Sequence, residues 1–253
     1  MPSAQLSAIV EYCQKTLEPE KFNDWDKALN GLQVENSGVV TKIAAAVDAT
    51  LATVRMAIAT EADLMIVHHG LFWADTIPWT GKRRELMELL VKHNISIYSS
   101  HLPLDAHPTL GNNALLCAAL GFRKLKPFFL ERGAHLGWQT HGHISRETLA
   151  SKLAAVLGQP PVLLPGGSEK CNRIGVVTGA AGAEMKLAAS EKVDTFITGE
   201  GPHWTYGLAE ELGINVFYGG HYATETFGVK ALAADLSKRF KVPWIFLDHP
   251  TGL

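Results

Sequence analysis

The sequence predicts an α/β protein of two similar lobes, each built on a mostly parallel sheet with helices on its faces. Three observations predict it: short apolar runs alternate with segments of helical spacing, the alternation occurs twice, and the two copies can be aligned. The length of 253 residues and the hydrophobic content of 47% are typical of a globular chain. We expect an N-terminal lobe over residues 1–125 and a C-terminal lobe over residues 126–253.

In the first half, strands are expected at short apolar runs and helices where apolar residues recur every three or four positions. The chain is expected to open with a helix that has Ser3 as a candidate N-cap. The strands are expected over residues 42–47, 62–67 and 95–99, and the helices over 51–60, 84–93 and 111–120. Such alternation is typical of parallel strands joined by helices.

The second half repeats this scheme after a less regular region at residues 123–172. That region is expected to hold one helix at 145–157 and a Pro- and Gly-rich loop at 159–167. The later strands are expected over 173–177, 193–198 and 214–218, and the later helices over 183–191, a segment ending at 208–212, and 224–239.

An internal repeat relates the two halves. Residues 42–73 align without a gap with residues 173–204, an offset of 131. The matched pairs include Asp63 with Asp194, Gly70 with Gly201, and Trp73 with Trp204. At an offset of 120, Tyr98-Ser-Ser-His101-x-x-x-Asp105 aligns with Tyr218-Gly-Gly-His221-x-x-x-Glu225. Residues 42–105 are therefore expected to resemble 173–225 as a duplication, although any two α/β units share part of this pattern.

The bulk composition argues against several protein classes. The net charge is −2 and the only tight basic run is Lys82, Arg83 and Arg84, so a nucleic-acid partner is not indicated. No apolar run approaches the roughly 20 residues of a membrane span, and the N-terminus does not resemble a signal peptide. The three cysteines are widely spaced and form no Cys-x-x-Cys pair, which argues against disulfides and for the reducing cytoplasm.

Four histidines and two acids lie at predicted strand ends. They are His68 and His69 after one strand, His101 and Asp105 after the next, and His221 and Glu225 after the last strand of the second half. Ligands of open α/β sheets bind beyond the carboxyl ends of the strands. Imidazole and carboxylate groups suit zinc, iron or manganese equally. A lone strand-end histidine is more often structural, but the joint pattern predicts a metal site.

The spacing of these residues restricts how they bind. Adjacent strand residues point to opposite sides, so His68 and His69 either reach two different ions or splay where Gly70 ends the strand. His221 and Glu225 share one helix face if the helix has begun by His221. The residues therefore suit one ion or two neighbouring ions.

Other residues carry weaker signals. Asp48 either supports a ligand or caps a helix, and Glu200, which aligns with His69, either faces the site or is a solvated loop acid. His135, His141 and His143 are expected in an exposed loop. The chain contains no P-loop, no Gly-x-Gly-x-x-Gly fingerprint and no Gly-x-Ser-x-Gly elbow.

A set of short motifs covers nearly the whole chain. They are Asn30-Gly-Leu-Gln-Val34, Val47-Asp-Ala-Thr50, Val67-His-His-Gly70, His101-Leu-Pro-Leu-Asp105, Gly111-Asn-Asn113, Ile197-Thr-Gly-Glu200 and Gly220-His-Tyr-Ala-Thr-Glu225. Together they resemble the Nif-three-like family, whose members are named GTP cyclohydrolase I type 2 homologues, in its short bacterial form. The resemblance implies two similar α/β lobes with a dinuclear metal site between them, and a toroidal homohexamer.

The resemblance also implies a ligand set of two divalent metal ions, zinc, iron or manganese. His68 and Asp105 would bind one ion and His69 and His221 the other, with Glu225 bridging them. His101 is left over from this set, and we expect it to carry protons in catalysis or to support a ligand.

The expected function is that of a dinuclear metal-dependent hydrolase. The substrate class suggested by the resemblance is a cyclic amide, an amidine or a nucleotide-like small molecule, as in opening the guanine ring of GTP. Against GTP, the sequence contains no obvious triphosphate cradle, and Lys82, Arg83 and Arg84 are the nearest basic group. Alternatives are another hydrolase, such as a phosphoesterase or peptidase, and a non-catalytic metal-binding ring that acts as chaperone, scaffold or regulator.

Overall fold

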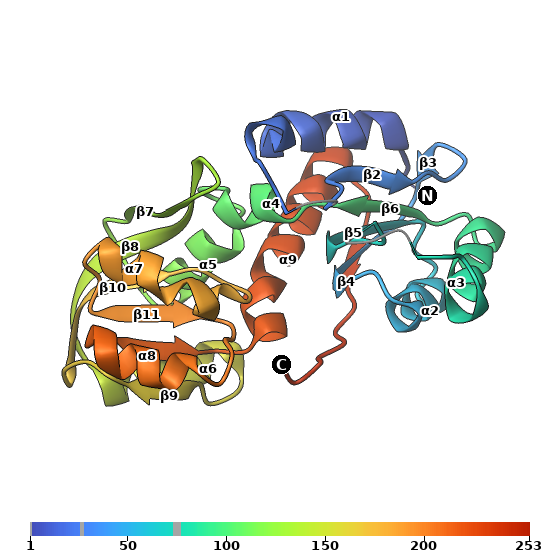
Figure 1. Cartoon of the computed structure of the whole chain (residues 1–253). Helices are drawn as coiled ribbons and strands as arrows, with labels where there is room; N and C mark the ends of the chain where they lie inside the picture. Colours follow the sequence, from blue (N-terminus) through green and yellow to red (C-terminus); the bar gives the residue numbers. More distant parts are fainter. Residues whose placement is uncertain (1, 26–27, 73–76) are drawn as a thin grey trace. The chain divides into compact units, whose positions relative to one another are not determined.

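The structure is a computed structural model that describes residues 2–25, 28–72 and 77–253, and it confirms the α/β class (Figure 1). The chain forms two compact units. The first unit contains Met1–Leu104 and Gly228–His249, and the second contains Asp105–Phe227 and Pro250–Leu253.

These units differ from the expected division after residue 125, because residues 105–125 belong to the second unit and 228–249 to the first. Specific contacts explain the difference. The Asn113 amide donates to the Leu136 carbonyl oxygen at 2.7 Å, and its oxygen accepts from the Thr178 backbone N–H at 2.6 Å, so this segment is bonded to the second unit. Strand β13 (Trp244–Phe246) pairs with β4 (Ile43–Asp48) of the first unit.

The first unit is built on a five-stranded sheet in the order β13-β4-β5-β6-β2. Its remaining strands are β5 (Leu64–His69), β6 (Ser96–Ser99) and β2 (Gly31–Val34). The β13–β4, β4–β5 and β5–β6 pairs are parallel, and β2 pairs antiparallel with β6. Every residue of β6, and all of β4 and β5 except the last residue of each, is buried, which is why these strands have continuous apolar runs.

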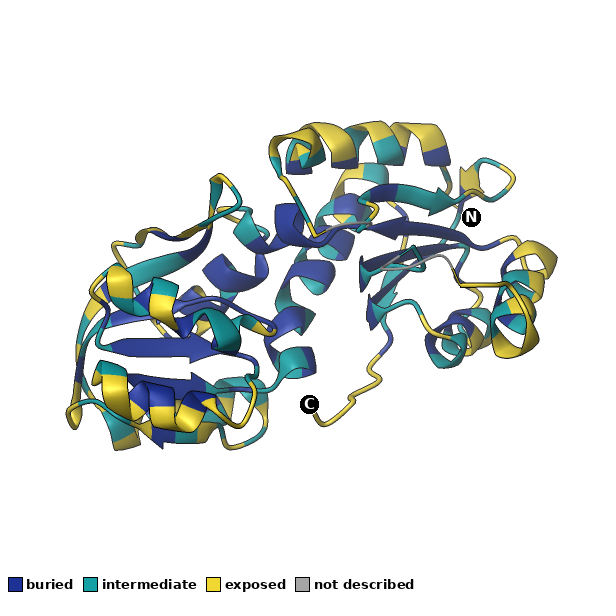
Figure 2. Cartoon of the chain, viewed as in Figure 1, coloured by how far each residue is buried: buried dark blue, intermediate teal, exposed yellow. Residues whose placement is uncertain are grey.

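Helices α2 (Leu51–Ala59) and α3 (Gly81–Lys92) cover one face of this sheet. Alternate strand residues such as Ala44, Ala46 and Met65 share a buried cluster with Leu86 and Leu90 of α3. Figure 2 shows the central strands mostly as buried, β2 mostly as intermediate, and the outer surfaces of α1 (Leu6–Leu17) and α3 as exposed. Strands β4 and β5 are less buried only at their last residues, Asp48 and His69, so polar groups are accommodated at these strand ends.

The N-terminal segment differs from the expectation that Ser3 caps a helix. Ala4–Gln5 form a short strand, β1, that pairs antiparallel with β3 (Val39–Val40), and α1 begins only at Leu6. The Leu6 N–H donates to the Gly38 carbonyl oxygen at 2.9 Å. The first helix therefore starts where this strand pairing ends, and its N-cap residue, Gln5, makes no side-chain capping bond.

The second unit contains a six-stranded sheet in the order β7-β8-β10-β11-β12-β9. Its bounds are β7 (Lys126–Glu131), β8 (Ala134–Ser145), β9 (Val162–Pro165), β10 (Lys170–Val176), β11 (Thr195–Thr198) and β12 (Asn215–Tyr218). The helical segments are α5 (Asn112–Ala119), α6 (Arg146–Leu157), η2 (Ala181–Glu184), α7 (Met185–Ser190) and α8 (Thr205–Leu212). The two units also share α4 (Leu102–Ala106) and α9 (His221–Phe240), and the first contains η1 (Pro19–Lys21).

Three strands of the second unit were missed from the sequence. The pairs β7–β8, β8–β10 and β12–β9 are antiparallel, whereas β10–β11 and β11–β12 are parallel. Gly137 interrupts the apolar pattern of β8, but a Cβ there would lie 2.4 Å from the Val176 carbonyl oxygen, so close strand packing requires glycine. The prediction of a loop at 159–167 is also wrong in part, because Val162–Pro165 form strand β9.

The two aligned segments share one structural feature, which lies just before β5 in the first unit and just before β11 in the second. The Asp63 carboxylate accepts from the backbone N–H groups of Thr41 and Lys42. The Asp194 carboxylate accepts in the same way from Asn172 and Arg173. Each acid thus joins two neighbouring parallel strands at their amino ends. The matched pair Trp73 and Trp204 is not comparable, because Trp73 lies outside the described residues.

The three cysteines are free and buried. Burial raises the pKa of both Cys13 and Cys117 to about 12, so both thiols are protonated at neutral pH. Among the helices of the described residues, none has the length and apolar character needed to cross a membrane.

Candidate metal centre

Three histidines come together at the carboxyl ends of β5 and β6 in the first unit. His68 and His69 are the last residues of β5, and their ring centroids are 4.8 Å apart. His101 follows β6, and its ring lies 4.9 Å from His68 and 5.7 Å from His69. One ligand nitrogen of each ring lies within 4.8 Å of the others. Although they are adjacent in the strand, His68 and His69 therefore converge on one region.

Each of these rings has an acceptor for its Nδ1 hydrogen. His68 Nδ1 donates to the Ser100 carbonyl oxygen at 2.9 Å, His69 Nδ1 to Asp48 Oδ1 at 2.8 Å, and His101 Nδ1 to Asp24 Oδ1 at 2.7 Å. Carbonyl and carboxylate oxygens can only accept, so Nδ1 carries the hydrogen and a neutral ring has its lone pair on Nε2. This is the usual arrangement behind histidines that bind metal.

The structure decides the role of Asp48. Thr50, not Asp48, is the N-cap of α2, because its hydroxyl accepts from the Thr53 backbone N–H in a capping box. Asp48 ends β4 beside His69, with the two residues paired across the parallel strands. Its carboxylate therefore supports a candidate ligand and does not cap the helix.

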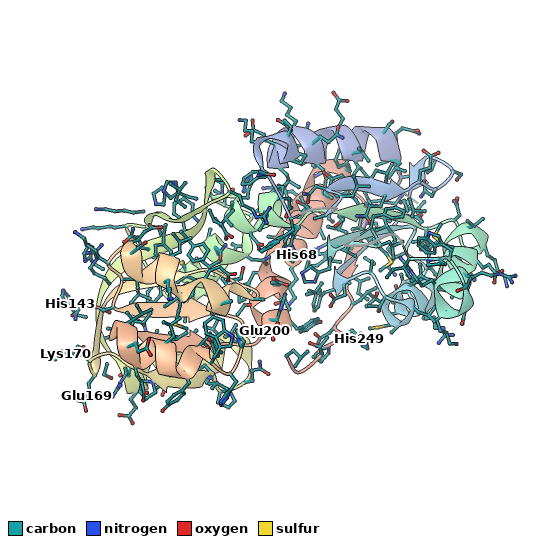
Figure 3. The ribbon with its side chains drawn as sticks, in the orientation of Figure 1. His68, His143, Glu169, Lys170, Glu200 and His249 are labelled. Atoms are coloured by element: carbon teal, nitrogen blue, oxygen red, sulfur yellow. The ribbon has the colours of Figure 1, made fainter. Side chains whose placement is uncertain are left out.

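In the second unit, α9 begins at His221, so His221 and Glu225 lie one turn apart on the same face. His221 Nε2 and Glu225 Oε2 are 3.2 Å apart, and His221 Nδ1 donates to Glu200 Oε1 at 2.7 Å. Glu200 is thus half-exposed but bonded to a candidate ligand (Figure 3). Burial lowers the pKa of His221, but Glu225 and Glu200 outweigh it and raise the pKa to about 9.

Glu225 needs a glycine opposite it. Gly179 follows β10 with φ +73°, and a Cβ at this position would lie 2.4 Å from Glu225 Oε1. The Gly179 backbone N–H donates to Thr224 Oγ1 at 3.1 Å, so the loop is bonded directly to the first turn of α9. Any side chain at 179 would push against the carboxylate, and the close approach therefore depends on glycine.

Asp105 is buried in α4 and completes the second set. Asn112 Nδ2 donates to Asp105 Oδ1 at 2.8 Å and Thr178 Oγ1 donates to the same oxygen at 3.3 Å. A carboxylate oxygen of Asp105 lies within 4.8 Å of one of Glu225. The second unit therefore brings Asp105, His221 and Glu225 together.

The residues of both sets fit a divalent cation. Neutral imidazole nitrogens and carboxylate oxygens are the donors that zinc, iron and manganese use. The first unit supplies three imidazoles, and the second supplies one imidazole and two buried carboxylates. All six residues predicted for the site thus lie in one of two clusters, each formed within its own unit.

Other predicted residues do not join these clusters. His135, His141 and His143 lie on β8 and not in a loop, and all three are exposed as expected. Figure 3 shows His143 projecting away from the second unit.

Asp24 and Thr178 were missed in the sequence. Thr178 could have been found, because it follows β10 at the strand end where ligands gather. Asp24 lies in a loop before β2 and has no periodic signal.

The comparisons with known proteins agree on one family. The model of the Duf34/NIF3 (NGG1p interacting factor 3) family matches residues 4–251. The chain is 39% identical over 232 residues to a protein of Deinococcus radiodurans named GTP cyclohydrolase 1 type 2 homolog, covering 90% of this chain and 88% of that protein. A protein of the same name from Pyrococcus horikoshii is 41% identical over 237 residues, covering 90% and 92% of the two chains.

Solved structures show the same similarity. The crystal structure of TTHA1606 from Thermus thermophilus superposes with a TM-score of 0.91 at 40% identity, covering 99% of this chain and all of that one. The protein ybgI, described as of unknown function, gives 0.92 at 33% identity, with 99% and 100% covered. By sequence over nearly its full length and by fold, the chain belongs to the Duf34/NIF3 family.

Proposed function

We propose that the chain binds two divalent metal ions and hydrolyses a small cyclic amide or amidine. The residues that would hold the ions are His68, His69, Asp105, His221 and Glu225. The observation that carries this assignment is the set of acceptors behind the rings: Ser100, Asp48 and Glu200 each take the Nδ1 hydrogen of one of these histidines. Such a partner is usual behind a metal-binding histidine, because it fixes the tautomer and the orientation of the ring.

The chemistry follows from the donors. A pair of bound divalent ions would supply a water molecule of lowered pKa and a Lewis acid for a carbonyl or amidine group. Around them, Asp48 and Glu200 orient His69 and His221, while Asn112 and Thr178 orient Asp105 through one of its oxygens. His101 lies within the histidine cluster but outside the assigned ligands, and we assign it the transfer of a proton to or from the substrate.

The substrate class rests partly on the names of the relatives, which point to opening of a guanine ring. The basic run offers no separate support for a triphosphate. Lys82 pairs with Glu85 at 2.9 Å, Arg84 with Glu88 at 2.6 Å, and Arg83 donates to the Ile77 carbonyl oxygen at 2.9 Å. We therefore propose cyclic amides and amidines as the class, with GTP as one member to be tested.

The assignment is tested by metal content. Protein prepared without added metal, and after exposure to zinc, should contain about two ions per chain. His221→Ala should lose at least one ion, and a matched His143→Ala variant, which removes an exposed histidine, should lose none. Failure of the wild-type chain to bind zinc, iron or manganese would refute the metal centre.

Turnover is tested separately on the metal-loaded protein. A screen of cyclic amides, amidines and GTP should give hydrolysis that disappears with His221→Ala. Metal binding without any turnover would instead favour the non-catalytic metal-binding ring. Native mass measurement of the same sample tests the homohexamer that we propose from the family resemblance.

A further inference from the structure

Asp24 lies in the loop between η1 and β2, and its side chain is only 6% exposed. Hydrogen-bond donors face both oxygens of its carboxylate. Oδ1 accepts from the Trp25 backbone N–H and from His101 Nδ1, both at 2.7 Å. Oδ2 accepts from Asn30 Nδ2 at 2.7 Å and from the Leu102 backbone N–H at 3.2 Å.

This environment suits a carboxylate and no other side chain. Both oxygens face donors, so an amide at position 24 would place its NH2 group against two N–H donors whichever way it turned. Burial raises the pKa of Asp24, but the hydrogen bonds from His101 and Asn30 outweigh it, so the pKa lies below its usual range. Asp24 is therefore an ionised, acceptor-only group at neutral pH.

The same loop holds His101 at two points. Its ring donates through Nδ1 to Asp24, and its backbone N–H donates to Asn30 Oδ1 at 2.7 Å. Asn30 in turn donates to Asp24, so the three residues form a closed network. A ring held at Nδ1 and at its own backbone has little freedom to rotate, and its other nitrogen keeps a constant direction.

We propose that Asp24 is the positioning residue of His101: its carboxylate holds the imidazole in the Nδ1–H tautomer and keeps the Nε2 lone pair available to the cluster of His68 and His69. The consequence for catalysis rests on the proposed function, in which the lone pair of His101 accepts a proton. The tautomer itself does not depend on that function. Asp24 accepts the Nδ1 hydrogen of His101 as Asp48 accepts that of His69, although Asp24 lies in a loop outside the aligned segments.

A purely structural role for Asp24, in place of the positioning of His101, would have a different consequence in a variant. Asp24 also joins its loop to the first residue of α4 through the Leu102 N–H, and loss of this bond alone would lower stability. A matched control is Asp63→Asn, which makes the same chemical change at a carboxylate that accepts several backbone hydrogen bonds at the amino end of β5. A second control, Asn30→Ala, weakens the loop but leaves the Asp24–His101 bond in place.

The test is nitrogen NMR of the full-length, zinc-loaded protein labelled with nitrogen-15 histidine, recorded at about pH 8, where an ordinary imidazole is neutral. His101 is assigned by the signals missing in His101→Gln. In the wild type His101 should be the Nδ1–H tautomer. In Asp24→Asn it should shift to the Nε2–H form or to a mixture, whereas Asp63→Asn and Asn30→Ala should retain the wild-type signals.

Two results would overturn the proposal. An Nε2–H tautomer for His101 in the wild-type protein needs no variant and would refute it even if Asp24→Asn failed to fold. An unchanged tautomer in folded Asp24→Asn would show that the ring is positioned by other groups.

Zinc content and turnover separate this inference from the proposed function. Asp24→Asn should keep its zinc, because Asp24 touches none of the five assigned ligands in the bonds described. It should lower kcat about 10- to 100-fold with little change in KM, which is the usual cost of removing a group that hydrogen-bonds a residue of the site. Absence of turnover in the wild type would refute the proposed hydrolase but leave the tautomer result to decide the role of Asp24.

Discussion

The two units share their strand scaffold but differ at the strand ends that carry chemistry. At the amino ends, Asp63 and Asp194 make the same hydrogen bonds to the preceding strand. At the carboxyl ends, the residues at aligned positions differ: His69 aligns with Glu200, and Asp48 aligns with Gly179. The first unit has three imidazoles there, and the second has one imidazole with carboxylates around it.

The two arrangements supply two kinds of donor. In the first unit the acid at position 48 supports the adjacent histidine. In the second unit the aligned position is Gly179, which leaves room for Glu225, and the acid at position 200 supports His221. Each unit therefore has an acid that accepts the Nδ1 hydrogen of a candidate ligand, at different positions of the aligned sequences.

The largest effect on metal binding is expected from Gly179→Ala. The new Cβ would lie 2.4 Å from Glu225 Oε1 and would displace a proposed ligand. Zinc affinity should therefore fall by more than roughly 100-fold, the upper value for losing a group that only hydrogen-bonds a ligand. Zinc competition titration measures it. Gly213→Ala is the control, because it has a similar φ of +65° but open space around its Cβ. Equal losses in both would mean that backbone strain, and not the contact with Glu225, is responsible.

Asp48→Asn and Glu200→Gln should have the next largest effect, and the two should be similar. Each removes the charge of the acid behind one ligand, His69 or His221, which typically costs about 10- to 100-fold in metal affinity. The same titration measures both, with the exposed Glu210→Gln as control. A loss in only one variant would break the equivalence between the two acids.

A pH effect on zinc affinity is expected from His221 and should amount to about tenfold per pH unit. Because the pKa of His221 is about 9 in the metal-free protein, zinc must displace its proton, and affinity should rise between pH 7.5 and 8.5. The stability of the folded, metal-free chain changes with pH in the opposite direction. A pKa raised above the unfolded value stabilises the metal-free chain fully below about pH 6.5, and this stabilisation is lost as the pH rises through about 9. Zinc titrations and thermal melts measure the two trends, and a flat affinity with pH would contradict this assignment.

The smallest effect on metal binding is expected from Asp63→Asn and Asp194→Asn. Each change leaves backbone donors facing an NH2 group, so each should lower the free energy of unfolding by about 1–3 kcal/mol. Zinc affinity should stay near that of the wild type, because both acids lie at the amino ends of the strands. Denaturant unfolding measures the cost, and a large loss of zinc in either variant would show that the two ends of the sheet are coupled.

Much of the candidate site could be read in the sequence because it depends on local pattern. Apolar runs predict the buried strands, and the residue after a run is at the strand end, which is how His68, His69, His101 and His221 were found. The four-residue spacing of His221 and Glu225 predicts a shared helix face, and α9 begins early enough to provide it. The alignment of the two halves rests on local pattern too, and its matched acids Asp63 and Asp194 make matching hydrogen bonds in the structure.

The sequence by itself therefore determined the α/β class, the repeated strand–helix scheme and the histidines and acids that stand at the strand ends. Only the tertiary structure decided which acid supports which ring, that β7, β8 and β9 extend the second sheet antiparallel, and that residues 105–125 fold with the second unit. The physical reason is the distance along the sequence between the residues that interact. Periodicity reports the environment of neighbours within one element, whereas Asp24 and His101 are 77 residues apart and meet only because a loop and a strand end are packed together.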